Sequence, residues 1–206
     1  MDTEKDYYIT IERTFLSKIE IKDSKFIAYL FPINKPEELK PILENLWKEH
    51  TSARHICYAY RFNENNYYYY DDGEPSGTAG LRIFTAMKLK NLTHAAIFVV
   101  RYFGGTKLGV GPLARAYFDT AMEVINKAEL VKKYFYKYFE VELNYGQFEK
   151  LKSSILKFSL EKPSFNFSDK IIISLPVKQS EVDLFQRFLK DNQVLFRIID
   201  DKSNSF

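Results

Sequence analysis

The sequence predicts an α+β protein of two domains, and three observations lead to this class. The 206 residues are enough for one large domain or two small ones. Aromatic residues make up 17% of the chain, which favours strands and well-filled cores. The apolar pattern switches repeatedly between every second residue, typical of strands, and every third or fourth, typical of helices.

The first part of the chain reads as strands interrupted by three helices. In order, the expected elements are two strands within 14–33 around a turn at 22–24, a helix at 37–50, a hairpin of 54–62 and 67–71 around 63–66, a helix at 78–88, a buried strand at 95–103, and a helix after the loop 104–111. Pro41 requires a late start or a kink of the first helix, whereas Pro112 fits the first turn of the last one. The tyrosines at 67–70 alternate between the faces of their strand, where cross-strand packing is a commoner role than stacking on bases.

A second domain is expected after a boundary near 128–133. Its predicted elements are a strand at 134–143, a helix at 145–157, strands at 159–167 and 170–177, a helix at 181–191 and a strand at 194–199. Asn144 with Gln147 predicts a capping box, and Ser180 with Asp183 predicts a second cap. The order βαββαβ is that of a ferredoxin-like domain. We therefore expect domains at 1–130 and 134–206, with a frayed tail at 200–206.

Composition and charge limit the classes of function. The chain has 30 Lys and Arg against 27 Asp and Glu, and its net charge of +3 is too small to indicate a nucleic-acid binder by itself. A single cysteine, Cys57, excludes an internal disulfide and fits a reducing compartment. The charged first residues are unlike a secretory signal, and the longest apolar run, 95–100, is too short to span a membrane. We therefore expect a cytoplasmic protein without a membrane segment.

Acidic and hydroxyl side chains gather in the segment 71–80, between a strand and a helix. They are Asp71, Asp72, Glu74, Ser76 and Thr78. The carboxylates could hold a divalent cation or act as acid and base, and the hydroxyls could cap the helix or bind phosphate. Alternatively, Asp72 and Ser76 satisfy loop and helix-terminal amides while the acids pair with arginines. Surface turns of this composition are common, which favours the second interpretation.

The segment 101–112 leads from a strand through a glycine-rich loop into a helix. Free amides and the helix dipole favour anions at such a place, although a tight packing loop is an equal alternative. From 75 to 118 the chain has six Lys or Arg and no acidic residue, so the local field is positive. The expected anion or nucleic-acid contacts are Arg101, Gly104, Gly105, Lys107, Gly109 and Arg115.

The histidines and the cysteine do not match a known metal or nucleophile pattern. His55 and Cys57 share a strand face but provide at most two ligands and have no third orienting group. We therefore expect no metal, no cofactor and a buried thiol. The catalytic residues of any enzyme activity cannot be named from the sequence.

Two long motifs resemble those of the YigZ/IMPACT family. They are Asp-Asp-Gly-Glu-Pro-Ser-Gly-Thr-Ala-Gly at 71–80 and Val-Val-Arg-Tyr-Phe-Gly-Gly-Thr-Lys-Leu-Gly at 99–109, supported by segments 24–28, 54–61 and 113–117. The resemblance implies that the first domain has the fold shared by a ribosomal-protein domain, GHMP kinases and a domain of translocase EF-G, with a left-handed βαβ crossover. It also implies that the second resembles a ferredoxin-like domain of EF-G.

The resemblance also implies a link to translation. Eukaryotic IMPACT competes for the activator of a stress-responsive initiation-factor kinase, but partly through an extra N-terminal domain, so that role is not carried over. We expect a non-enzymatic regulatory protein whose partner is RNA or the ribosome, or else a translation-related protein. The alternatives are an enzyme that handles phosphate or uses a metal, and a protein-interaction regulator without chemistry. Residues 134–206 carry 11 basic and 10 acidic side chains, so the second domain is not a basic RNA clamp.

Overall fold

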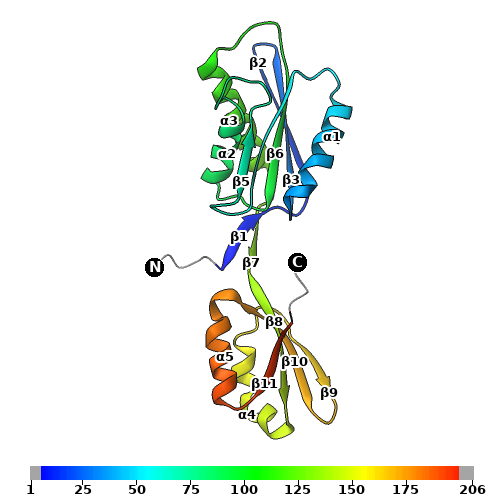
Figure 1. Ribbon diagram of the computed structural model, residues 1–206, viewed down its shortest axis with the longest axis vertical. Helices are drawn as coiled ribbons and strands as arrows, with labels where there is room; N and C mark the ends of the chain where they lie inside the picture. Colours follow the sequence, from blue (N-terminus) through cyan, green and yellow to red (C-terminus); the bar gives the residue numbers. More distant parts are fainter. Residues whose placement is uncertain (1–5, 200–206) are drawn as a thin grey trace. The chain divides into compact units, whose positions relative to one another are not determined.

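The computed structural model describes residues 6–199, which form two compact units (Figure 1). One unit is residues 8–132, and the described part of the other comprises residues 6–7 and 133–199. Each unit combines a β-sheet with helices, which confirms the α+β class. The boundaries expected for independently folding domains stay a prediction, and the expected frayed tail lies outside the described residues.

The larger unit is built on a five-stranded antiparallel sheet with the strand order β2-β3-β6-β4-β5. Its strands are β2 (Phe15–Ile21), β3 (Ser24–Pro32), β4 (His55–Arg61), β5 (Tyr67–Tyr70) and β6 (Ala95–Tyr102). The central strand β6 is buried along all but its last residue. Its continuous apolar run is therefore explained by helices on both faces of the sheet.

Three helices cover this sheet. Helix α1 (Leu39–Glu49) packs on one face, and helices α2 (Gly80–Leu89) and α3 (Val110–Lys127) pack together on the other (Figure 1). Pro41 lies in the first turn of α1, just after a short 3-10 helix at Pro36–Glu38. The late start, one of the two solutions expected for this proline, accommodates it.

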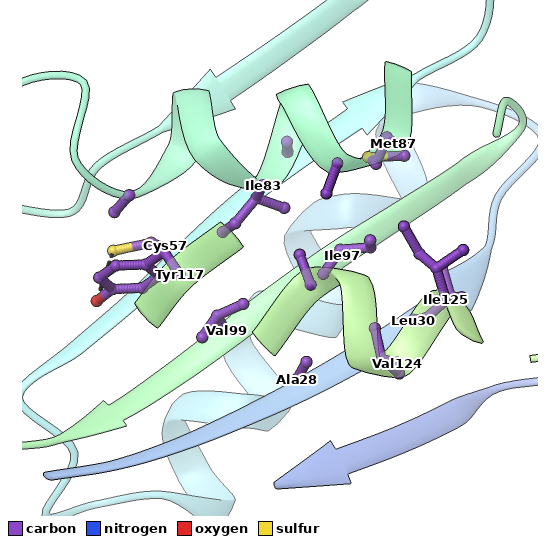
Figure 2. Packing of buried hydrophobic residues seen from close by; sticks show 14 of the residues in the cluster. Ala28, Leu30, Cys57, Ile83, Met87, Ile97, Val99, Tyr117, Val124 and Ile125 are labelled. Carbon is purple, nitrogen blue, oxygen red and sulfur yellow. Dashed lines mark hydrogen bonds between the residues drawn. The ribbon is translucent and has the colours of Figure 1, made fainter. Parts of the chain in front are cut away.

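The main core lies between the sheet and helices α2 and α3. Alternate residues of the strands point into it, as period-two geometry requires, and they meet one stripe of each helix (Figure 2). Cys57 and Val99 come from β4 and β6, Ile83 comes from α2, and Tyr117 and Val124 come from α3. All five are fully buried, and Tyr117 is the largest fully buried side chain of the described chain.

Helices α2 and α3 begin at the same end of the sheet, where strands β5 and β6 finish. Strands β5 and β6 are each antiparallel to β4, so they run parallel to each other, and each leads into one of these helices. The segments 71–79 and 103–109 therefore both lie at this end of the sheet, where the two long sequence motifs meet. The left hand expected for the crossovers stays a prediction.

The smaller unit has the predicted βαββαβ order. Its elements are β8 (Tyr136–Leu143), α4 (Tyr145–Leu156), β9 (Ser164–Phe167), β10 (Ile171–Lys178), α5 (Val182–Asp191) and β11 (Leu195–Ile199). The strands form an antiparallel sheet in the order β11-β8-β10-β9, the ferredoxin-like arrangement. The capping box of α4 is confirmed: the Gln147 amide donates to Asn144 Oδ1 at 2.8 Å, and the Asn144 amide donates to Gln147 Oε1 at 3.0 Å.

Two expectations for this unit are wrong. The strand expected over 159–167 begins only at Ser164, and Ser159 forms an isolated bridge instead. Ser180 does not cap α5, because its amide and hydroxyl both donate to the carboxylate of Asp6, 174 residues away. Glu181 precedes the helix without a side-chain cap.

Two short strands were not expected from the sequence. Strand β1 (Tyr7–Thr10) pairs with β7 (Val131–Tyr134), which occupies the segment expected to be a boundary. The carbonyl oxygen of Asp6, next to β1, also accepts the Phe135 amide at 2.8 Å. No helix within residues 6–199 has the length and apolar character needed to cross a membrane.

Candidate functional site

The acidic loop, residues 71–80, is held in place chiefly by the carboxylate of Asp71. Its oxygens accept the backbone amides of Gly77 at 2.9 Å, Ala79 at 3.1 Å and Gly80 at 2.8 Å. These amides belong to the loop and to the start of α2. The first amides of a helix have no hydrogen-bond acceptor within the helix, so Asp71 provides one. Asp71 thus performs the capping role that the sequence assigned to Asp72 and Ser76.

Asp72 extends the sheet rather than facing solvent. Its carboxylate accepts the Ile56 amide at 2.7 Å, at a point of β4 where β5 has already ended. Its carbonyl oxygen lies 2.6 Å from Nδ1 of His55. A carbonyl can only accept, so Nδ1 of His55 carries a hydrogen. The backbone of Asp72 has φ +45, a left-handed conformation that these contacts must hold in place.

Glu74 points into the protein and pairs with Arg101. Glu74 Oε1 accepts Arg101 Nη1 at 2.5 Å and the Tyr117 hydroxyl at 2.8 Å. The side chains of Glu74 and Arg101 are only 4% and 7% exposed, so both charges are buried. The pair links the acidic loop to the end of β6, and Tyr117 links it to α3.

Cys57 and His55 complete this buried polar cluster. The Cys57 thiol lies 3.0 Å from the carbonyl oxygen of Asp71 and 3.4 Å from the Tyr117 hydroxyl. Figure 2 shows the Cys57 and Tyr117 side chains side by side. Burial raises the pKa of the Cys57 thiol far above its ordinary value and also raises the pKa of Tyr117. Nε2 of His55 lies 3.9 Å from Glu74 Oε2. At neutral pH the thiol is therefore protonated and a poor nucleophile.

The remaining polar residues of the acidic loop do not join the cluster. The Thr78 hydroxyl donates to the Pro75 carbonyl at 2.6 Å, and Ser76 is exposed. Within residues 6–199, no group of three or more His, Cys, Asp or Glu side chains is placed to hold a metal ion. The carboxylates of Asp71, Asp72 and Glu74 are instead bound by separate partners.

The glycine loop, residues 103–109, uses its glycines in two different ways. A Cβ on Gly104 would lie 2.1 Å from the carbonyl carbon of Asp23, so the turn between β2 and β3 leaves room only for glycine. Gly105 and Gly109 have φ +87 and +85, which favours glycine for conformational reasons. A Cβ on Gly105 would meet no other atom within 4 Å, so this part of the loop is open.

The three cations expected to converge near this loop do not all do so. Arg101 is buried against Glu74, and its guanidinium carbon lies 5.5 Å from the centre of the Phe26 ring. Its Nε atom has no hydrogen-bond partner among the described residues. Lys107 is exposed, and Arg115 is 82% exposed and pairs with Asp119 one turn further along α3. The expectation for Arg101 was wrong because a buried carboxylate from another segment neutralises it.

Helix α3 begins without a cap. Gly109 precedes it and has no side chain to accept an amide, the first turn has no acidic residue, and Pro112 has no amide hydrogen. Within residues 6–199 no side chain caps this helix, so the amides of Val110 and Gly111, which follow Lys107 by three and four residues, are left for solvent or a ligand. This is the arrangement that favours an anion.

These motif-bearing segments also match a known sequence family. The sequence model of the Impact N-terminal domain matches residues 22–125, which is half of the chain and includes both loops. The chain belongs to the IMPACT family. The chain is 28% identical to IMPACT family member YvyE of Bacillus subtilis over 186 residues, which cover 89% of this chain and 86% of that protein. It is 29% identical to an IMPACT family member of Haemophilus influenzae, covering 89% and 91% of the two chains.

A solved structure supports the fold across both units. It is a crystal structure described as that of a hypothetical protein, with a TM-score of 0.65 and 22% identity, covering 97% of this chain and all of that chain. At this identity the likeness concerns the fold. It supports the two-domain α+β architecture of the IMPACT family member described here.

Sequence reasoning missed three members of the buried cluster as site residues. His55, Cys57 and Tyr117 lie on segments that the resemblance already marked, at 54–61 and 113–117. The usable signal was that polar residues occur among the apolar residues of a buried strand and of a helix stripe. Glu74, which accepts the Tyr117 hydroxyl and lies 3.9 Å from His55, could not be found from spacing, because it lies 43 residues from Tyr117.

Proposed function

We propose that this protein is a non-enzymatic regulator associated with translation, and that it binds RNA or the ribosome through phosphates at the glycine loop. The link to translation rests on the family resemblance. The phosphate contact rests on the start of α3, which no side chain of residues 6–199 caps, and on the exposed Lys107, which precedes Val110 and Gly111 by three and four residues.

The charge distribution supports this site. Of the six cations in the acid-free stretch 75–118, only Arg101 is neutralised by a buried carboxylate. Arg115 pairs with Asp119 at 3.4 Å, an exposed pair within one helix that is worth about 0.3–0.5 kcal/mol and can give way to a phosphate. Arg82 is exposed in the first turn of α2, at the same end of the sheet.

The geometry does not favour the alternative of a cation-dependent enzyme. That alternative needed the acidic loop to present several carboxylates to one ion. Asp71 and Asp72 accept backbone amides, and Glu74 accepts Arg101 and Tyr117. A carboxylate already bound in this way stabilises the loop and is less available to a ligand.

A salt series of binding tests the proposal. The affinity of the full chain for single-stranded oligouridylate and for ribosomes is measured at increasing salt, for the wild type, Lys107→Glu and Lys88→Glu. Lys88 is the matched control because it is exposed in the last turn of α2, at the opposite end of that helix. Lys107→Glu should weaken binding and reduce the slope of log affinity against log salt by about 0.7, the value for one contact with a single strand.

Lys88→Glu should leave the slope unchanged. Equal binding by Lys107→Glu and the wild type, or no wild-type binding at low salt, would contradict the proposal. Either result would favour the alternative of a protein-interaction regulator without chemistry.

A further inference from the structure

Strand β5 forms an uncovered edge of the larger sheet. It consists of Tyr67–Tyr70 and pairs only with β4 in the described chain. Its four side chains are between 39% and 48% exposed, although all are aromatic. Large aromatic side chains gain most when they are buried, so four in a row on an edge is an unusual exposure of apolar surface.

The register shows which backbone groups are free on this edge. The Phe62 amide donates to the carbonyl of Asn66, the residue opposite it if the register of the strands is continued, which makes 62 and 66 a hydrogen-bonded position of the ladder. Hydrogen-bonded positions recur at every second residue of an antiparallel pair. Tyr68 and Tyr70 consequently bond inward to β4. The amides and carbonyls of Tyr67 and Tyr69 point outward, away from the sheet. The Ile56 amide donates to the Asp72 carboxylate, which follows β5. This agrees with the assignment, because even-numbered residues of β4 then direct their backbone groups toward β5.

The side chains of β5 are supported from behind on both faces. On the face of α2, the Tyr67 ring stacks on Phe84 at 4.5 Å between centroids. On the other face, Tyr70 lies 5.6 Å from Tyr58, and Tyr68 lies 6.1 Å from both Tyr58 and Tyr60. The edge is therefore a preformed strand with aromatic rings above and below it.

The opposite edge of the same sheet is protected in the usual way. Strand β2 carries the exposed charges Lys18 and Glu20, which disfavour pairing with another strand. Strand β5 has no charge and no proline. The two edges differ in the features by which proteins prevent edge-to-edge association, so the exposure of β5 is specific to that edge.

The available area indicates what kind of partner fits. Four tyrosines that are about 40–50% exposed offer roughly 350 Å² for burial, using about 200 Å² per aromatic side chain. A stable protein interface buries about 800 Å² on each partner. This edge is thus too small for a stable dimer of the chain but suits one extended segment bound by backbone hydrogen bonds.

We propose that β5 captures an extended, uncharged peptide segment of a partner protein, rich in β-branched and aromatic residues, as an added sixth strand of the sheet. The peptide exchanges hydrogen bonds with the outward amides and carbonyls of Tyr67 and Tyr69. Its side chains alternate between the rings backed by Phe84 and those backed by Tyr58 and Tyr60. This mode of binding uses main-chain bonds for affinity and side-chain contacts for selectivity, and it does not depend on the glycine loop.

The probe is a capped peptide, Lys-Thr-Val-Thr-Tyr-Val-Thr-Lys, titrated into the isotope-labelled full chain. Chemical-shift changes should centre on the amides of Tyr67 and Tyr69. The controls are two N-methylated forms of the same peptide, one methylated at the odd-numbered residues and the other at the even-numbered residues. In a bound strand, one of these forms lacks the amide hydrogens that face β5, and the other lacks those that face away from it. One methylated form should bind about three- to tenfold more weakly for each hydrogen bond lost, and the other should bind like the parent.

A pair of variants separates the backbone contact from the ring. Tyr69→Pro removes one outward amide hydrogen and leaves the bonds to β4 in place, whereas Tyr69→Thr removes the same ring but keeps the amide. We expect Tyr69→Pro to bind the probe about three- to tenfold more weakly than Tyr69→Thr. The methylated peptides test the wild type itself, so the result stands even if the proline variant does not fold.

Three kinds of result would overturn the proposal. The first is a negative peptide titration, either with no shift of the β5 amides at millimolar peptide or with equal binding of the parent and both methylated peptides. The second is a dimer in sedimentation experiments that Tyr69→Pro dissociates, because a second copy would then occupy the edge. The third is a response of the same amides to oligouridylate and not to the peptide, which would make the tyrosines a stacking surface for RNA bases.

Discussion

The acidic loop and the glycine loop occupy equivalent places in the fold but have opposite relations to solvent. Each follows one of two parallel strands and leads into a helix at the same end of the sheet. In the acidic loop the carboxylates of Asp71, Asp72 and Glu74 all bind groups of the protein. In the glycine loop Lys107 is exposed and α3 begins without a cap.

This difference shows that the charge of a segment does not reveal whether its side chains bind other groups of the protein or stay exposed to solvent. The acidic loop looks more reactive in the sequence, yet it serves as the scaffold that fixes this end of the sheet. The basic segment loses one cation, Arg101, to that scaffold. What remains open to a ligand is the start of α3, because no carboxylate within residues 6–199 caps it.

The largest effect should come from removing the ion pair between the acidic loop and the end of β6. Glu74→Ala leaves the buried Arg101 guanidinium without its carboxylate, which typically lowers the free energy of unfolding by about 3–5 kcal/mol. Urea denaturation at neutral pH measures it. Glu20→Ala is the control, because Glu20 and Lys25 form an exposed pair worth at most about 1 kcal/mol. Similar losses for both variants would show that burial of the Glu74 pair does not matter.

A second test separates packing from openness within the glycine region. Gly104→Ala places a Cβ against the backbone of Asp23 and should destabilise the protein by about 1–3 kcal/mol or more. Gly111→Ala has no atom within 4 Å of the new Cβ and should be neutral or slightly stabilising in the first turn of α3. Thermal and urea denaturation of the two variants provide the comparison. An equally tolerated Gly104→Ala would mean that the β2–β3 turn does not pack on this loop.

The capping role of Asp71 can be tested by comparing it with Ser76, an exposed residue of the same loop that caps no helix. Asp71→Ala removes the acceptor for three amides and should lower the free energy of unfolding by about 1–3 kcal/mol. Hydrogen exchange of the Gly80 amide should become faster. Ser76→Ala should change stability by less than about 0.5 kcal/mol, because Ser76 is exposed. If Ser76→Ala were the more harmful variant, the assignment of the cap to Asp71 would be wrong.

The smallest effect concerns the reactivity of Cys57. Burial and the raised thiol pKa should make the native protein nearly inert to a disulfide reagent at pH 8, with modification limited by opening of the structure. Glu74→Ala should accelerate the reaction by loosening the cluster around the thiol, whereas Glu20→Ala should not. Rapid labelling of the folded wild type would contradict the buried position.

Local sequence patterns determined the elements and much of their order. Apolar periodicity predicted the five α-helices of residues 6–199 to within a few residues, and it predicted the βαββαβ order of the smaller unit. The capping box of Asn144 and Gln147 was predictable because its partners lie within one helical turn. The resemblance of the two long motifs added the family and placed attention on the two loops.

The tertiary structure alone decided which polar groups meet. The sequence predicts a helix cap at Ser180, but its partner in the structure is Asp6, 174 residues away. Arg101 looked like a free cation until the sheet order placed Glu74 beside it. The physical reason is range: helical and strand periodicity reach a few residues along the chain, while buried charges and amides are satisfied by whatever segment the fold brings next to them.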